Sequence, residues 1–117
     1  MKEGLVGIEI EHSGDVVVAR VTGELDIAGA PRTGDRIAEA VPTSALGLVV
    51  DLCDLEFMDS SGVAMLFSLA RLLGSRRQKL RVAATPGGPI ARVLDIVEFE
   101  RAAPVHGDPD AAIADIT

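Results

Sequence analysis

The 117-residue sequence has no tryptophan, no tyrosine, three phenylalanines and one cysteine. The formal charge of −7 argues against binding to the phosphate backbone of nucleic acid, and the few aromatic rings offer no platform for stacking bases. Nucleic acid is therefore not an expected partner. The lone cysteine, Cys53, excludes a disulfide within the chain and fits a reducing compartment. No apolar run approaches the ~18 residues of a membrane-spanning helix. We therefore expect a cytoplasmic protein without membrane association.

The apolar content is high enough to build a core unaided. Hydrophobic residues make up 48% of the chain, and a compact chain of this length buries roughly two-thirds of its unfolded surface. Folding should therefore need no metal, nucleotide or other cofactor. The length predicts one domain over residues 1–117.

Apolar patterning predicts an N-terminal β-hairpin and a central strand. Residues 5–11 alternate between apolar and polar, residues 12–15 are turn formers, and residues 15–22 are rich in β-branched side chains. Gly23 is expected to end the second strand. Residues 46–52 form a short, nearly continuous apolar run, which is typical of a strand buried on both faces.

The remaining segments predict helices alternating with short strands. Further apolar pieces lie at residues 80–84 and 102–105, and helical spacing occurs at residues 31–41, 59–73, 90–97 and 109–116. This order predicts an α/β fold, with a mixed sheet of four to five strands packed with about four helices.

The familiar catalytic arrangements are missing from the sequence. The two histidines, His12 and His106, are far apart and accompany no Gly-x-Ser-x-Gly elbow, which argues against a hydrolytic triad. They and Cys53 also lack metal-ligand spacing. Asp51 and Asp54 disfavour a Cys53 thiolate, so we interpret Cys53 as structural. We expect a protein that is not an enzyme.

Residues 54–63 are the informative segment, because there the exit of the strand predicted at residues 46–52 leads into the helix predicted from residue 59. Asp59 or Ser60 can cap that helix, since a side-chain oxygen satisfies a free N–H group of the first turn. The run Asp59, Ser60, Ser61 followed by Gly62 also places hydroxyls at the positive end of the helix dipole. A phosphate added there is electrostatically tolerated. Capping alone is the simpler interpretation of Ser60.

Residues 57–62 (Phe-Met-Asp-Ser-Ser-Gly) and 22–26 (Thr-Gly-Glu-Leu-Asp) resemble the STAS domain of bacterial anti-sigma factor antagonists. The resemblance extends over nearly the whole chain, including residues 92–95 (Arg-Val-Leu-Asp) in a helix. It implies that Ser60 is phosphorylated by an anti-sigma factor with serine kinase activity. The unphosphorylated protein would bind this factor and free the sigma factor, and a phosphoserine phosphatase would reset the switch. Asp59, Ser61, Gly62 and Asp26 are expected around Ser60.

Two other functions remain open on the sequence. One is a STAS scaffold module in another assembly, such as a stressosome-like signalling complex or a lipid-transport system. The other is a small α/β enzyme, which would require a pocket of titratable groups with perturbed pKa values.

A second apolar stripe on the helix predicted from residue 59 has two interpretations. Met65, Leu69 and Leu72 lie nearly opposite the stripe expected to face the sheet. Either a neighbouring helix covers them, or Met65 and Leu69 are exposed and form the apolar centre of a partner interface.

Overall fold

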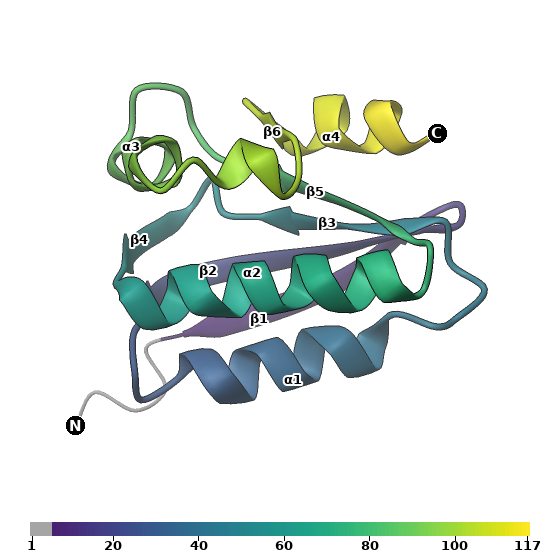
Figure 1. Cartoon of the computed structure of the whole chain (residues 1–117), viewed down its shortest axis with the longest axis horizontal. Coiled ribbons are helices and arrows are strands. Elements are labelled where there is room, and N and C mark those ends of the chain that lie inside the picture. Colours follow the sequence, from purple (N-terminus) through teal and green to yellow (C-terminus); the bar gives the residue numbers. More distant parts are fainter. Residues whose placement is uncertain (1–5) are drawn as a thin grey trace.

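A computed structural model describes residues 6–117 (Figure 1). Within this range the strands are β1 Gly7–Ser13, β2 Val16–Leu25, β3 Gly47–Asp51, β4 Leu55–Met58, β5 Lys79–Ala83 and β6 Val105–His106. The helices are α1 Ala30–Ala40, α2 Ser60–Ser75, α3 Pro89–Ile96, the short 3-10 helix η1 Phe99–Arg101 and α4 Pro109–Ile116. The predicted α/β class and the four α-helices are confirmed.

All six strands belong to one mixed sheet. The order is β1-β2-β3-β5-β6, with β4 paired separately to β2. Only the hairpin pair β1 and β2 is antiparallel among the described strands. Every residue of β3 is buried, which confirms the predicted central strand. The hairpin is confirmed too, although Leu5, the first residue of its predicted first strand, lies outside the described residues.

The prediction that Gly23 ends the second strand is wrong. β2 continues to Leu25, and Gly23 has a φ of +86° at a break in the pairing register. The extra residue at this break is Glu56 on β4, so β2 continues through Gly23, and glycine adopts positive φ at little cost. The pairing of β2 with β3 ends at Arg20, and from Gly23 onward β2 pairs with β4, a strand that the sequence did not predict. The sheet therefore has one more strand than the upper limit predicted.

Alternation along the strands divides the core between the two faces of the sheet. Leu48 and Val50 of β3 belong to the larger cluster, under α1, α2 and α3, in which Phe67 and Phe99 form an edge-to-face pair with centroids 5.0 Å apart. Val49 belongs to the smaller cluster, which Ala112 and Ile116 of α4 cover on the other face. Figure 1 shows α1 and α2 on one side of the sheet and α4 on the other.

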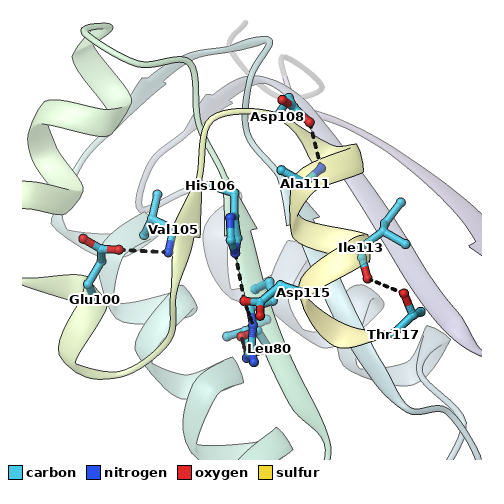
Figure 2. A network of polar contacts seen from close by, with 10 residues as sticks. Leu80, Glu100, Val105, His106, Asp108, Ala111, Ile113, Asp115 and Thr117 are labelled. Atoms are coloured by element: carbon cyan, nitrogen blue, oxygen red, sulfur yellow. Dashed lines mark hydrogen bonds and ion pairs between the residues drawn. The ribbon is translucent and has the colours of Figure 1, made fainter.

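A polar cluster of Arg81, His106 and Asp115 links α4 to the sheet. Arg81 Nε on β5 donates to Asp115 Oδ2 at 2.6 Å, and His106 Nε2 on β6 lies 2.9 Å from the same oxygen. Figure 2 shows His106 and Asp115 facing each other between β6 and α4. Asp108 caps the helix, because its Oδ1 accepts from the Ala111 N–H at 2.8 Å.

This cluster predicts a pH effect on stability. Hydrogen bonds from His106 and Arg81 hold the pKa of Asp115 below its usual 3.8. The stabilisation is therefore complete above about pH 4 and is lost as the pH falls through the lower pKa of the folded state. We expect the free energy of unfolding of Asp115→Asn to fall less steeply with decreasing pH than that of the wild type, as measured by urea unfolding from about pH 2 to 5. Asp35→Asn is the control, because Asp35 is exposed and has no ion-pair partner among residues 6–117. Parallel curves for the wild type and Asp115→Asn would contradict the prediction.

Candidate functional site

Asp59 holds the turn from β4 into α2. It is the N-cap residue, and its Oδ1 accepts from the backbone N–H groups of Ser61 at 2.8 Å and Gly62 at 3.4 Å. Its own N–H donates to the carbonyl oxygen of Leu25 at 3.1 Å. The cap is therefore tied to the end of β2, so the start of α2 is fixed to the sheet.

Ser60 is the first residue of α2 and is exposed. Within residues 6–117 its hydroxyl makes no hydrogen bond. Of the two capping residues that the sequence allowed, the structure uses Asp59. The interpretation of Ser60 as a cap is therefore wrong, and its hydroxyl is free to react. Ser61 follows, half-buried, with its backbone N–H held by Asp59.

Gly62 lets the first turn of α2 pack closely on the sheet. It is buried, and a Cβ atom added there would overlap Met58 Cγ and lie 3.1 Å from Leu25 Cβ. Leu25 and Met58 are paired residues of β2 and β4. The glycine therefore sets the height of α2, and of Ser60 on it, above these two strand ends.

Asp26 lies at the same edge of the sheet as Asp59. Leu25 and Met58 are paired in parallel strands, and Asp26 and Asp59 are the residues that follow them. Asp26 Oδ1 accepts from the Ala28 N–H at 3.0 Å, and its carbonyl oxygen accepts from the Ala30 N–H at 2.8 Å. Asp26 thus shapes the turn into α1, next to the turn into α2.

The loops before α1 and α2 are acidic, and the first basic residue after Asp26 is the exposed Arg32 in the first turn of α1. Residues 24–31 and 54–70 contain Glu24, Asp26, Asp54, Glu56 and Asp59 but no lysine or arginine. Arg20 compensates one of these charges through an ion pair with Asp54. No group of His, Cys, Asp and Glu side chains suited to a metal ion occurs in residues 6–117. No helix in that range is long and apolar enough to cross a membrane.

Met65 and Leu69 are not exposed, so the prediction that they are is wrong. Their exposed fractions are 6% and 3%, and α1 packs over them in the larger core cluster. Gly34 of α1 makes this packing possible, because a Cβ there would lie 2.8 Å from Met65 Cγ. The interpretation in which a neighbouring helix covers this stripe is confirmed for these two residues. They line only the floor of a groove of about 550 Å³ between α1 and α2, where Leu72 is half-buried.

Ile27 directly follows Asp26, Phe57 comes two residues before Asp59, and both were missed as surface candidates. Their exposed fractions are 78% and 48%. Ile27 follows Asp26 in the loop before α1, and Phe57 on β4 pairs with Glu24 on β2. For Ile27 a signal was present, because a large apolar residue in a loop usually lies at the surface.

Cys53 lies in the loop between β3 and β4 and is half-buried. Its N–H donates to Asp51 Oδ1 at 3.0 Å, and its carbonyl oxygen accepts from the Thr85 hydroxyl at 3.2 Å. Burial, followed by the hydrogen bond and charge of Asp51, raises the pKa of the Cys53 thiol from 9.0 to about 11.

The raised pKa predicts slow thiol chemistry. At about pH 8 the thiolate fraction of Cys53 should be about a hundredfold lower than that of an unperturbed cysteine. We expect DTNB to react with the folded protein slower by about that factor than with the same protein in urea. Equal rates in both conditions would contradict the prediction.

The STAS domain family model matches residues 7–112 of this chain. The chain belongs to the STAS domain family. It is 26% identical over 110 residues, 93% of each chain, to an anti-sigma F factor antagonist of Paenibacillus polymyxa. The crystal structure of an anti-sigma factor antagonist from Mycobacterium paratuberculosis has a TM-score of 0.85 and 28% identity, covering 95% of this chain and 93% of that one.

The STAS fold is also shared with SpoIIAA, described as an anti-sigma factor antagonist. Its unphosphorylated form has a TM-score of 0.70 and 22% identity, covering 93% of this chain and 96% of that one. A structure of SpoIIAA from Bacillus in the phosphorylated form has a TM-score of 0.71, also at 22% identity, covering 95% of this chain and 100% of that one. The resemblance predicted from the sequence is therefore confirmed at the level of family and fold.

Proposed function

We propose that this STAS domain is an anti-sigma factor antagonist that is switched off by phosphorylation of Ser60. Its partner is an anti-sigma factor with serine kinase activity. Binding of the unphosphorylated protein frees a sigma factor and so regulates transcription. The protein acts as a binding partner and kinase substrate rather than as an enzyme, and a phosphoserine phosphatase restores the active form.

One observation carries the proposal: the Ser60 hydroxyl is free, while Asp59 alone caps the helix. In the phosphorylation step, Ser60 Oγ attacks the γ-phosphorus of ATP bound to the kinase. The new bond joins Oγ to phosphorus, the bond from phosphorus to the bridging oxygen of ADP breaks, and the hydroxyl proton passes to a base of the kinase. The names of the relatives support the anti-sigma partner. Asp26, Ser61 and Gly62 position the loop but do not react.

Mass spectrometry tests the site assignment. The protein is incubated with ATP and the anti-sigma factor kinase of the same organism, then digested with trypsin. The peptide covering residues 37–71 contains Ser60 together with Thr43, Ser44, Ser61 and Ser68, so fragmentation must locate the phosphate. We expect it on Ser60 in the wild type and in Ser61→Ala, and nowhere in Ser60→Ala. Phosphate on Ser61 alone, or on no residue, would refute the assignment.

A further inference from the structure

Unpaired basic side chains and an exposed leucine lie together just beyond the C-terminal end of α2. Residues 60–94 contain no aspartate or glutamate. Within this stretch Arg76, Arg77 and Lys79 are exposed, and none of them forms an ion pair within residues 6–117. Leu46, in the loop before β3, is 49% exposed. We call these four residues the basic patch.

Hydrogen bonds hold the two segments of the basic patch against each other. The Lys79 N–H donates to the carbonyl oxygen of Leu46 at 3.1 Å. Gln78 is buried, and its Nε2 donates to the carbonyl oxygens of residues 42 and 45 at 2.9 and 3.0 Å. Arg76 Nη1 donates to the Val41 carbonyl oxygen at 3.4 Å. Residues 41–46 and 76–79 therefore form one continuous surface.

The basic patch lies at the opposite end of α2 from Ser60. The helix begins at Ser60 and ends at Ser75. Figure 1 shows the end of α2 beside the loop that joins α1 to β3. A partner bound to the patch therefore leaves the start of α2 accessible.

Arg77 occupies a backbone position that usually belongs to glycine. Its φ is +59°, in the left-handed region, and it follows the C-cap residue Arg76. The Arg77 N–H donates to the Gly74 carbonyl oxygen at 3.1 Å, and the Gln78 N–H donates to the Leu73 carbonyl oxygen at 2.9 Å. This pair of hydrogen bonds is a Schellman motif, in which glycine is favoured at the position of Arg77. The helix dipole does not account for this costly choice, because Arg76 already places a cation at the end of α2.

The chemistry of the basic patch matches a short acidic protein segment that also carries an apolar residue. Guanidinium groups pair with carboxylates through two parallel hydrogen bonds, and Leu46 offers an apolar contact between chains. Asp15 and Glu39 are exposed on adjoining segments, where the Asp15 carbonyl oxygen accepts from the Leu46 N–H at 2.8 Å. With these carboxylates nearby and a formal charge of −7 on the chain, a wide anionic surface such as a membrane or nucleic acid is repelled.

The acidic end of a second copy of this chain is a poorer match. Asp26 and Asp59 accept hydrogen bonds within their own turns, and Asp54 pairs with Arg20. These carboxylates are therefore already engaged, whereas the basic patch requires carboxylates that are free to pair.

We propose that the basic patch binds an acidic segment of another protein, with Leu46 in contact with an apolar residue of that segment. The patch is separate from Ser60, so the domain can hold one partner at each end of α2. Failure of the proposed phosphorylation switch would leave this inference standing, because no part of the patch takes part in that switch.

An acidic probe peptide tests the patch. The probe, acetylated Glu-Glu-Asp-Leu-Asp-Glu-Glu, is titrated into isotope-labelled protein at about 50 mM salt, and the amide shifts are followed by NMR. We expect the shifts to be confined to residues 41–46 and 74–79. Arg77→Gln should weaken binding about fivefold. Arg77→Gly should weaken it equally without lowering the melting temperature, because glycine adopts positive φ at little cost.

Arg92→Gln is the matched control for Arg77→Gln. Arg92 is exposed on α3 and has no ion-pair partner within residues 6–117, so this variant should bind the probe like the wild type. Leu46→Ser should weaken binding about threefold, and so should serine in place of the leucine of the probe. Combining these two changes should cost no more than either alone, because both remove the same contact.

Several results would overturn the proposal. They include no binding of the probe, shifts elsewhere in the protein, and equal weakening by Arg77→Gln and Arg92→Gln. Additive losses from the two leucine changes would refute the contact with Leu46. Without probe binding, attachment to phosphatidylcholine vesicles that contain about 30% phosphatidylserine would assign the patch to a membrane. A salt-sensitive dimer that Arg77→Gln abolishes would assign it to a second copy instead.

Discussion

Phosphorylation of Ser60 is expected to weaken binding to the anti-sigma factor kinase more than about a hundredfold while the domain stays folded. The phosphate adds about −1.5 to −2 charges at pH 7. It joins Asp59 next to it, with Glu56 on β4 and Asp26 directly after β2. In a closed interface this charge must lose water beside like charges.

Under the proposed function, Ser60 meets the γ-phosphate of ATP during transfer, so it would lie opposite the bound nucleotide. After transfer, the phosphoserine faces the remaining phosphates of ADP. Repulsion on both sides therefore favours release of the phosphorylated protein.

The free energy of unfolding should change little on phosphorylation, because the Ser60 side chain does not stabilise the turn. Asp59 supplies the cap to Ser61 and Gly62, and the Ser60 side chain is exposed. The N-terminus of a helix also favours negative charge. The melting temperature of the phosphorylated protein should therefore stay close to that of the unmodified protein, which separates release from unfolding.

Variants make the switch testable without purified phosphoprotein. Ser60→Ala should remain bound to the kinase when ATP is present, whereas the wild type should dissociate as it is phosphorylated. Ser60→Asp should bind weakly from the start. Ser61→Ala should behave like the wild type. Release of Ser60→Ala by ATP, or tight binding of phosphorylated wild type, would overturn the switch.

The hydrophobic pattern was sufficient to predict the class, the hairpin and the central strand, because these depend on local periodicity. β4 was missed because only tertiary pairing defines it. Its four residues are too few to show a period, and their partners in β2 begin at Gly23, the residue at which the second strand was predicted to end. The position of Asp26 beside Asp59 follows from that same pairing, whereas the resemblance had only suggested it.

Burial on α2 shows a second limit of the sequence. Periodicity identifies Met65 and Leu69 as apolar, but it does not say which neighbour covers them. The decisive residue is Gly34. Its low helix propensity would by itself only weaken α1, but its missing side chain lets α1 approach Met65. The capping choice was likewise undecided, because Asp59 and Ser60 are both good N-cap residues.

The second large effect is expected from Gly62→Ala, which should lower the free energy of unfolding by about 1–3 kcal/mol through overpacking. The added Cβ meets Met58 and Leu25, which are both buried and paired to each other in β4 and β2. Neither can move without disturbing the end of the sheet. The helix propensity of alanine, worth up to about 1 kcal/mol over glycine, offsets only part of this loss.

Gly74→Ala is the matched control for this prediction, because it makes the same substitution in α2. A Cβ at Gly74 meets nothing within 4 Å, so only the gain in helix propensity remains. We expect Gly74→Ala to raise the free energy of unfolding by roughly 0.5–1 kcal/mol, and both variants can be measured by urea unfolding. If the two substitutions change the free energy of unfolding in opposite directions, the close packing of α2 requires Gly62. If both variants were stabilised alike, the glycine would not set the position of α2. Because the first turn must shift to admit the methyl group, Gly62→Ala should also slow phosphorylation of Ser60 by the kinase.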